Sequence, residues 1–323
     1  MNPFSPFEIE GQGFTQQALE LFRFQAQNNP VYREFLDTLR VDPAAVTALD
    51  RIPFLPVRLF KERPVRTTDF IPEAVFESSG TTGSVNSRHE VKDLSLYRNS
   101  CLKGFELNYG PTAGWCILGL LPSYLERSHS SLVFMVDELI RKSGHADSGF
   151  YLYDHEKLFA LLSRLEAAGQ KTLLIGVSFA LLDFSEEYSL ALRHTVVMET
   201  GGMKGRRREL VREELHAILA SRLGVPLIHA EYGMTELLSQ AYSKGNGLFT
   251  PVPWMKVLVR SEDDPFEVKE VGEGVLNIVD LANVWSCSFL ATDDVGKVYP
   301  DGNFDVSGRM DNSDIRGCSL LVM

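Results

Sequence analysis

The sequence predicts an α/β protein in which a parallel-rich sheet, covered by helices, is followed by a β-rich lobe. Short, uninterrupted apolar runs alternate with segments of helical apolar spacing between residues 75 and 245. The runs at residues 115–121, 172–177, 195–198 and 226–229 are expected as strands, and residues 130–142, 155–168 and 206–223 as helices. Strands that are apolar throughout, with helices between them, are typical of a parallel sheet buried on both faces.

The sequence patterns at the two ends of the chain differ from the pattern of residues 75–245. Residues 15–39 have helical spacing interrupted at Pro30, and a proline-spaced extended stretch covers residues 51–62. Beyond residue 250, WMKVLVR, FEVKEV, GVLNIVDL, SFLATD and VGKVYP are short runs separated by Gly, Asp and Pro, which indicates antiparallel strands. With no linker in view, we expect a single domain over residues 1–323. Its parts are a helical and extended segment (1–74), an α/β core (75–245), a β-rich lobe (246–307) and a C-terminal tail (308–323).

Composition narrows the function class. The 323 residues carry a net charge of −11, with 44% hydrophobic and 23% charged residues, as in ordinary globular proteins. This acidic balance argues against a nucleic-acid-coating protein. No apolar run approaches the roughly 20 residues of a membrane span, and no secretory signal is visible. The four cysteines lack metal spacing, so we expect a cytoplasmic protein in which Cys101, Cys116 and Cys287 are small buried residues.

The first chemical motif is SSGTTG at residues 78–83, after an apolar Ala-Val-Phe. Its two glycines let the backbone curl closely around a ligand, and four hydroxyls add donors, which suits a phosphate chain. The lysine of a P-loop is absent. An ordinary polar hairpin loop is the alternative.

The second motif is EYGMTE at residues 231–236, after the apolar run that ends at His229. A strand that ends here would place an aromatic ring and a carboxylate at the carboxyl edge of the sheet, where open α/β folds bind ligands. The carboxylate could hold Mg²⁺ against phosphates. A tyrosine and a glutamate at a simple strand corner are the alternative.

The third motif lies near the end, as Thr292-Asp293-Asp294 followed by GRMDNSDIRG at residues 308–317. An aspartate can accept hydrogen bonds from both ribose hydroxyls, and an arginine can reach ribose or phosphate. Two β-turns would favour the same residue types.

Together, and in this order, these motifs resemble the signatures of the adenylate-forming superfamily. IPFLPVRLFK, METGGMKGRRREL and the C-terminal IRGCSLLV are more narrowly similar to the LuxE-type acyl-protein synthetases, from about residue 50 to the end. The resemblance implies the large N-terminal-domain fold of these enzymes, with ATP and Mg²⁺ as cofactors. It also implies that the small C-terminal domain is absent, because the sequence ends six residues after Gly317.

The resemblance implies a role for each matching residue. ATP phosphates would be held by Ser79, Thr81, Thr82 and Gly83. Gly201 and Gly202 would lie along the adenine and acyl pocket, and Tyr232 would flank the adenine. Thr235 would contact the α-phosphate region, Glu236 would ligate Mg²⁺, and Asp294 with Arg309 would hold the ribose. Asp294 is preferred to Asp293 by comparison with the T-G-D form of the motif.

Cys318 lies immediately beyond the last motif. In LuxE-type synthetases a cysteine near the C-terminus accepts the acyl group as a thioester, so the resemblance implies this role for Cys318. Arg316 and Arg309 could favour its thiolate, and His229 could act as its base. A structural cysteine in a short terminal strand is the alternative.

The expected function is ATP-dependent activation of a carboxylic acid, in particular a fatty acid, and transfer through Cys318 to a partner such as an acyl reductase or a carrier protein. An acyl-CoA or amide ligase without an acyl-cysteine is one alternative. A catalytically silent nucleotide-binding subunit is another. The sequence leaves open the acid, the final acceptor and the oligomeric state, a homodimer included.

Overall fold

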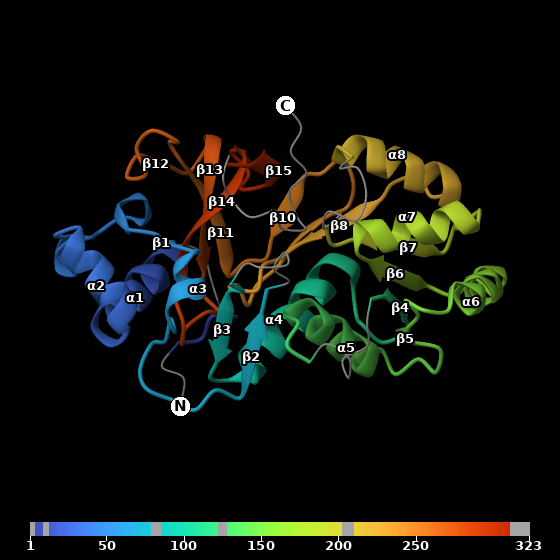
Figure 1. Ribbon diagram of the computed structural model, residues 1–323, viewed down its shortest axis with the longest axis horizontal. Coiled ribbons are helices and arrows are strands. Elements are labelled where there is room, and N and C mark those ends of the chain that lie inside the picture. The colour runs from blue at the N-terminus through green and yellow to red at the C-terminus, as the bar shows by residue number, and fades with distance from the viewer. Residues whose placement is uncertain (1–3, 9–12, 79–84, 122–127, 202–209, 311–323) are drawn as a thin grey trace. The chain divides into compact units, whose positions relative to one another are not determined.

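A computed structural model describes the chain except for residues 1–3, 9–12, 79–84, 122–127, 202–209 and 311–323 (Figure 1). The chain forms two compact units whose segments alternate along the sequence. The first unit comprises Met1–Cys101, Met234–Gln240 and Thr250–Ser313, and the second comprises Leu102–Gly233, Ala241–Phe249 and Asp314–Met323. Helix α4 (Leu94–Tyr109) and strand β10 (Phe249–Pro251) each contain residues of both units.

The second unit is built on a parallel sheet, as predicted. Strands β4 (Cys116–Leu120), β5 (Gly149–Phe150), β6 (Thr172–Gly176), β7 (Thr195–Glu199) and β8 (His229–Tyr232) are parallel. The order is β9-β8-β7-β6-β4-β5, in which β9 (Ala241–Ser243) runs antiparallel to β8. All residues of β4 and β6 are buried, which explains their uninterrupted apolar sequence.

Helices cover both faces of this sheet. They are α5 (Ser131–Ser143), α6 (His155–Ala167), α7 (Ser178–Glu187) and α8 (Arg212–Leu223). A Cβ atom at Gly119 of β4 would lie 3.2 Å from Val136 of α5, and one at Gly176 of β6 would lie 3.2 Å from Leu181 of α7. Gly119 and Gly176 face opposite ways, because Leu120 rather than Gly119 is the neighbour of Gly176 in the register. Figure 1 shows α5 on one side of the strands and α7 on the other.

Two predicted elements of this unit are placed differently. The strand expected at residues 226–229 begins only at His229, so the first two residues of EYGMTE belong to strand β8 instead of following it. Its sequence, His-Ala-Glu-Tyr, has no apolar run because this strand buries polar side chains. The helix expected from residue 206 begins at Arg212, and α7 was not predicted.

The first unit combines N-terminal helices with an antiparallel sheet. Its helices are α1 (Gly13–Asn28), α2 (Pro30–Thr38) and α3 (Leu59–Glu62), with 3₁₀ turns η1 (Pro43–Ala45) and η2 (Leu49–Arg51). The predicted break at Pro30 is confirmed, because Asn29 caps α2 by accepting a hydrogen bond from the Tyr32 amide at 3.0 Å. The buried side chain of Gln25 in α1 donates to the carbonyls of Asn283 and Val284, both at 3.0 Å. These hydrogen bonds connect the N-terminal helices to the segment that contains Asn283 and Val284.

The antiparallel sheet of this unit has the order β12-β11-β13-β14-β15. Its strands are β11 (Met255–Arg260), β12 (Val268–Lys269), β13 (Gly272–Asp280), β14 (Phe289–Val298) and β15 (Phe304–Arg309), and β1 (Leu55–Pro56) pairs in parallel with β14. SFLATD and VGKVYP, predicted as two strands, form the single strand β14. The Asp293-Asp294 pair is therefore ladder rather than turn. Strand β15 was not predicted.

A separate hairpin of the first unit joins β2 (Ala74–Glu77) and β3 (Arg88–Val91) in antiparallel register. Ser78 and Ser87 close its end, where the Ser78 amide donates to the Ser87 carbonyl at 3.0 Å and the Ser87 amide donates to Ser78 Oγ at 2.9 Å. SSGTTG thus begins at the closed end of this hairpin. Among the described residues, none of the helices has the length and apolar character needed to cross a membrane.

Candidate active site

The predicted site residues fall on both units. Thr235, Glu236, Asp294 and Arg309 belong to the first unit, and Gly201 and Tyr232 belong to the second. Outside the described residues lie Ser79, Thr81, Thr82, Gly83, Gly202 and Cys318. Their roles stay predictions.

The structure brings Asp294 and Arg309 together. They are directly opposed in the β14–β15 ladder, and Arg309 Nε lies 3.1 Å from Asp294 Oδ1. Both residues are buried, at 4% and 5% exposure. Asp293 is more exposed, and its Oδ2 lies 3.4 Å from Arg309 Nη2. The two aspartates thus share one guanidinium, and Asp294 is its buried partner.

Arg260, which the sequence analysis did not single out, anchors the same segment. Its guanidinium donates to the Thr292 carbonyl at 2.6 Å and to Asn277 Oδ1 at 2.7 Å. Thr292 Oγ1 accepts a hydrogen bond from the Asp294 amide at 3.1 Å and donates to the Leu276 carbonyl at 2.8 Å. The backbone that presents Asp294 is therefore fixed by polar contacts with Arg260 of β11 and Leu276 of β13.

The Thr235–Glu236 segment is held by its carbonyl groups. The Thr235 carbonyl lies 2.8 Å from Nδ1 of His89 on strand β3, and the Glu236 carbonyl accepts from Asn283 Nδ2 at 2.8 Å. Because a carbonyl oxygen only accepts, His89 Nδ1 must carry the proton. Burial lowers the pKa of His89 despite the opposing influence of Thr235 and Glu236, which keeps the ring neutral.

The residues after Glu236 are bound by a buried carboxylate. Asp280 accepts from the amides of Leu238 and Ser239, at 2.8 and 3.1 Å, and from the Ser239 hydroxyl at 2.5 Å. Burial raises the pKa of Asp280 to about 6, although these hydrogen bonds oppose the shift. Asp280, Asn283 and His89 together fix the segment that carries the fully buried Glu236. None of the three stood out in the sequence, because each acts through main-chain contacts far away in the chain.

In the second unit, Gly201 and Tyr232 lie at the carboxyl ends of the neighbouring parallel strands β7 and β8. Tyr232 is buried, and its ring packs against Phe249 with centroids 5.8 Å apart. Gly201 has φ +73°, in the left-handed region that favours glycine. This edge is where the second motif predicted a ligand site.

A cluster of ionisable side chains accompanies this edge. Glu199 Oε1 lies 3.6 Å from Arg212 Nε and 3.5 Å from His216 Nε2. Burial would raise the pKa of Glu199, but the neighbouring His216 and the charge of Arg212 outweigh it, and the pKa is lowered. On the next strand, burial and the Glu199 charge raise the pKa of Glu231 to about 8. The cluster therefore holds one ionised and one protonated carboxyl group at neutral pH.

His229, considered above as a base, lies beside Tyr109, whose hydroxyl is 3.1 Å from His229 Nδ1. Burial and the charges of Lys244 and His216 lower the pKa of His229 to about 4. The ring is therefore neutral at physiological pH and has a structural hydrogen bond to Tyr109.

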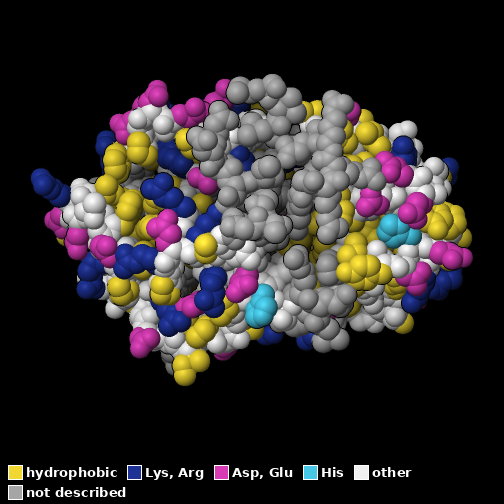
Figure 2. Space-filling model, in the orientation of Figure 1, with side chains coloured by type: hydrophobic (Ala, Val, Ile, Leu, Met, Phe, Trp, Pro, Cys, Tyr) yellow, Lys and Arg dark blue, Asp and Glu magenta, His cyan; other side chains and the backbone are white. Residues whose placement is uncertain are grey.

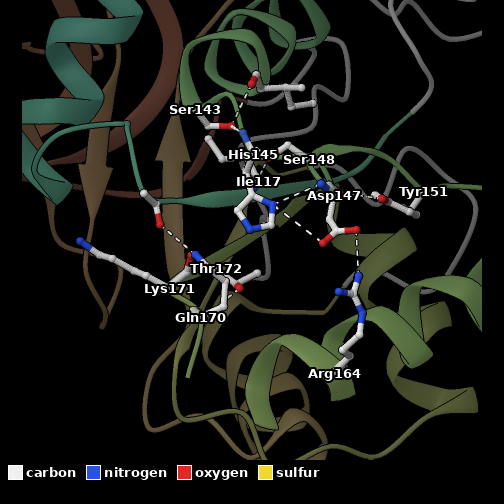
Figure 3. Close-up of polar contacts among 12 residues, drawn as sticks. Ile117, Ser143, His145, Asp147, Ser148, Tyr151, Arg164, Gln170, Lys171 and Thr172 are labelled. Atoms are coloured by element: carbon white, nitrogen blue, oxygen red, sulfur yellow. Dashed lines mark hydrogen bonds and ion pairs between the residues drawn. The ribbon is translucent and has the colours of Figure 1, made fainter. Parts of the chain in front are cut away.

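His145 and Asp147 serve local structure (Figure 3). Arg164 Nη2 donates to Asp147 Oδ1 at 2.8 Å, and the Asp147 amide donates to His145 Nδ1 at 3.2 Å. Asp154 caps α6 by accepting from the Lys157 amide at 3.0 Å. In the described part of the chain, no group of three or more His, Cys, Asp and Glu side chains is arranged to hold a metal ion.

Two further observations concern side-chain placement. Cys101, Cys116 and Cys287 are buried, as expected for small apolar residues. Acidic and basic side chains are interspersed over the described part of the face seen in Figure 2.

Solved structures with the same fold are adenylate-forming ligases. 2-Hydroxyisobutyryl-CoA ligase, in complex with 2-HIB-AMP and CoA, matches with a TM-score of 0.66 at 12% identity, over 97% of this chain and 74% of that chain. O-succinylbenzoate coenzyme A synthetase (MenE) from Bacillus subtilis, in complex with ATP and magnesium, matches with a TM-score of 0.53 at 16% identity, over 94% of this chain and 66% of that chain. A mutant form of coronafacic acid ligase from Pectobacterium brasiliense gives a TM-score of 0.50 at 15% identity over 77% of this chain. The chain matches only 50% of the length of that ligase.

The fold is thus that of the N-terminal portion of adenylate-forming enzymes, as predicted. The sequence matches the family "Acyl-protein synthetase, LuxE" over residues 5–323. The protein belongs to the LuxE acyl-protein synthetase family. A comparison with curated proteins gives no match.

Proposed function

We propose that the protein activates a carboxylic acid with ATP to an acyl-adenylate and then transfers the acyl group to the thiol of Cys318. The observation that carries the first step is the buried Asp294–Arg309 pair, with 3.1 Å between Arg309 Nε and Asp294 Oδ1, in a member of the LuxE family. Asp294 and Arg309 are 15 residues apart in the sequence and meet there on adjacent strands, which supports the ribose-holding role implied by the resemblance.

The segment around Glu236 has the chemistry expected of a magnesium ligand. Its carboxylate lies on a backbone pinned by Asn283, His89 and Asp280, so the side chain is presented from a fixed position. Carboxylate oxygens are the donors that Mg²⁺ prefers. When bound, Mg²⁺ offsets the negative charge of the phosphates. On this proposal Thr235 would donate to the α-phosphate region and Tyr232 would flank the adenine.

The proposed chemistry has three bond exchanges. A carboxylate oxygen of the acid attacks the α-phosphorus of ATP, and the bond to pyrophosphate breaks. The Cys318 thiolate then attacks the acyl carbonyl, which forms a thioester and releases AMP. Finally, a nucleophile of an acceptor, such as an acyl reductase or a carrier protein, takes the acyl group and restores the thiol. The family name supports an acyl group as the transferred group, and a fatty acid is the substrate class that the resemblance to LuxE-type synthetases implies.

The test is ATP–pyrophosphate exchange with a series of carboxylic acids of increasing chain length. Exchange stimulated by at least one acid is expected, and Cys318→Ser should keep the exchange but lose covalent labelling by radioactive acid. Labelling that persists in Cys318→Ser would refute the thioester step. Transfer of label to CoA or an amine from that variant would favour a CoA or amide ligase. An absence of exchange with every acid would refute activation itself and favour a silent nucleotide-binding subunit.

A further inference from the structure

Glu199 lies where strand β7 ends, and its side chain is only 4% exposed. One carboxylate oxygen, Oε2, accepts from the Gly201 amide at 2.5 Å and from Ser178 Oγ at 3.2 Å. The other, Oε1, faces Arg212 Nε at 3.6 Å and His216 Nε2 at 3.5 Å. One buried carboxylate therefore joins a backbone turn to two basic side chains of α8.

The turn at Gly201 is held through both of its peptide groups. Its amide donates to Glu199, and its carbonyl accepts from the Ser178 amide at 3.4 Å. The preceding Thr200 amide donates to the Gly176 carbonyl at 3.1 Å. Because φ of Gly201 is +73°, the chain takes a sharp turn here, and the Glu199 carboxylate sets where that turn begins.

The same carboxylate acts on Tyr232 through its partner Arg212. The Arg212 guanidinium lies over the Phe249 ring, 5.3 Å from its centroid. Phe249 in turn packs on Tyr232, with ring centroids 5.8 Å apart at an interplanar angle of 61°. Glu199 is thus connected to Gly201 and Tyr232, the two described residues of the second unit that are predicted to lie along the nucleotide.

Stability alone is a poor explanation for this arrangement. Desolvating a carboxylate and a guanidinium is costly, and apolar side chains of similar volume often stabilise a core equally well or better. A fixed carboxylate does supply what an apolar side chain does not, namely an acceptor for the Gly201 amide and a directional contact for Arg212. The arrangement is suited to holding the Gly201 turn and the Tyr232 ring at the end of β8 in position.

We propose that Glu199 is a positioning residue of the nucleotide site, which fixes the Gly201 turn and, through Arg212 and Phe249, the Tyr232 ring. The proposal rests on the function proposed above for those two residues. Loss of the Glu199 charge should loosen the Gly201 turn and the Tyr232 ring and thereby weaken ATP binding. The chemical step should be unaffected, because Glu199 touches no reacting group.

The experiment is Glu199→Gln in the full-length chain, assayed by ATP–pyrophosphate exchange with the best acid. Glutamine keeps the shape and one acceptor oxygen but loses the charge that holds Arg212 and His216. The KM for ATP should rise about tenfold, with kcat changed less than about twofold, because a hydrogen bond to a charged group is lost from a positioning contact. Glu187→Gln is the matched control. It removes another carboxylate–histidine pair of the same unit, 3.1 Å from His155 but 55% exposed, and should leave both constants unchanged.

The outcomes separate the two proposals. An unchanged KM for ATP in Glu199→Gln, or a loss confined to kcat, would overturn the positioning role. If this variant does not fold by circular dichroism, His216→Asn removes one partner only and should raise the KM about threefold, and an unchanged KM there would overturn the proposal. If the wild type exchanges with no acid, the proposed function fails. In that case calorimetric titration with ATP still tests Glu199, since the wild type should bind ATP more tightly than Glu199→Gln, and equal affinities would overturn the positioning role.

Discussion

Asp293 and Asp294 are neighbours that contact the same guanidinium but differ in burial, so they form a matched pair of perturbations. The Asp294 side chain is 6% exposed, and its Oδ1 lies 3.1 Å from Arg309 Nε. The Asp293 side chain is 36% exposed, and its Oδ2 lies 3.4 Å from Arg309 Nη2. Replacing each by asparagine removes one negative charge and keeps the side-chain shape.

The two replacements should differ several-fold in cost. Removing one partner of a buried ion pair costs about 3–5 kcal/mol, because the other charge stays buried without compensation. Asp293 remains beside Arg309, so we expect Asp294→Asn to lower the free energy of unfolding by about 3 kcal/mol, at the low end of that range. An exposed ion pair contributes roughly 0–1 kcal/mol, so Asp293→Asn should cost less than about 1 kcal/mol.

Urea unfolding followed by circular dichroism measures both costs, and the KM for ATP in the exchange assay measures the ribose role. Only Asp294→Asn should raise the KM, whereas Asp293→Asn should leave it within about twofold. Equal losses of stability would refute the reasoning from burial. A raised KM confined to Asp293→Asn would move the ribose assignment to Asp293.

Three further predictions concern stability. His89→Leu should lower the free energy of unfolding by about 1–3 kcal/mol, because the Thr235 carbonyl loses its donor. His89→Asn should lose less stability, because its amide can replace Nδ1, and equal losses in urea unfolding would contradict this. Because the pKa of buried His89 is lowered, the unfolded chain takes up the proton first as the pH falls. Wild-type stability should therefore decrease as the pH drops below about 6.5, and His89→Asn should lack that decrease in a pH series of urea titrations. Burial and a neighbouring carboxylate raise the pKa of Glu231 to about 8, so its ionisation should lower stability as the pH rises towards and through 8, and Glu231→Gln should flatten that decline in thermal melts across this range.

How accurately each strand was predicted from the sequence depended on the contacts that form it. Strands β4, β6 and β7 were predicted to within about two residues, because strands buried on both faces need uninterrupted apolar sequences. Strand β8 was displaced because it buries the ionisable side chain of Glu231 and begins with the partly buried His229, which no local pattern distinguishes from a loop. Strand β14 was divided in two because Asp293-Asp294 has the composition of a turn, although Arg309 on the neighbouring strand binds both side chains.

The site shows the same division. That Asp294 and Arg309 belong to one site was predicted only through the family resemblance. Their direct ion pair was not predicted, because motif order identifies residues and not their contacts. The groups that hold the motifs in place were not predicted. His89 reaches Thr235 across 146 residues of sequence, and Asp280 reaches Leu238 across 42. Such bonds leave no periodicity and no fixed spacing in the sequence.

Buried carboxylates hold the segment after Glu236 and the turn at Gly201. The pKa of Asp280 shows that the first of these contacts has a cost in stability. The pKa of Asp280 is raised to about 6, so at neutral pH the fold keeps an ionised carboxylate that burial disfavours. Its oxygens accept from the Leu238 and Ser239 amides directly after Glu236, just as the Glu199 carboxylate accepts from the Gly201 amide. An apolar side chain at either position would avoid the desolvation cost but would leave these amides without an acceptor. At Asp280 the fold therefore gives up some stability to fix a backbone segment that carries predicted site residues. At Glu199 the partners outweigh the cost of burial, because the pKa of this carboxyl group is lowered. This supports the interpretation that Asp280 serves the geometry of the site rather than the stability of the core.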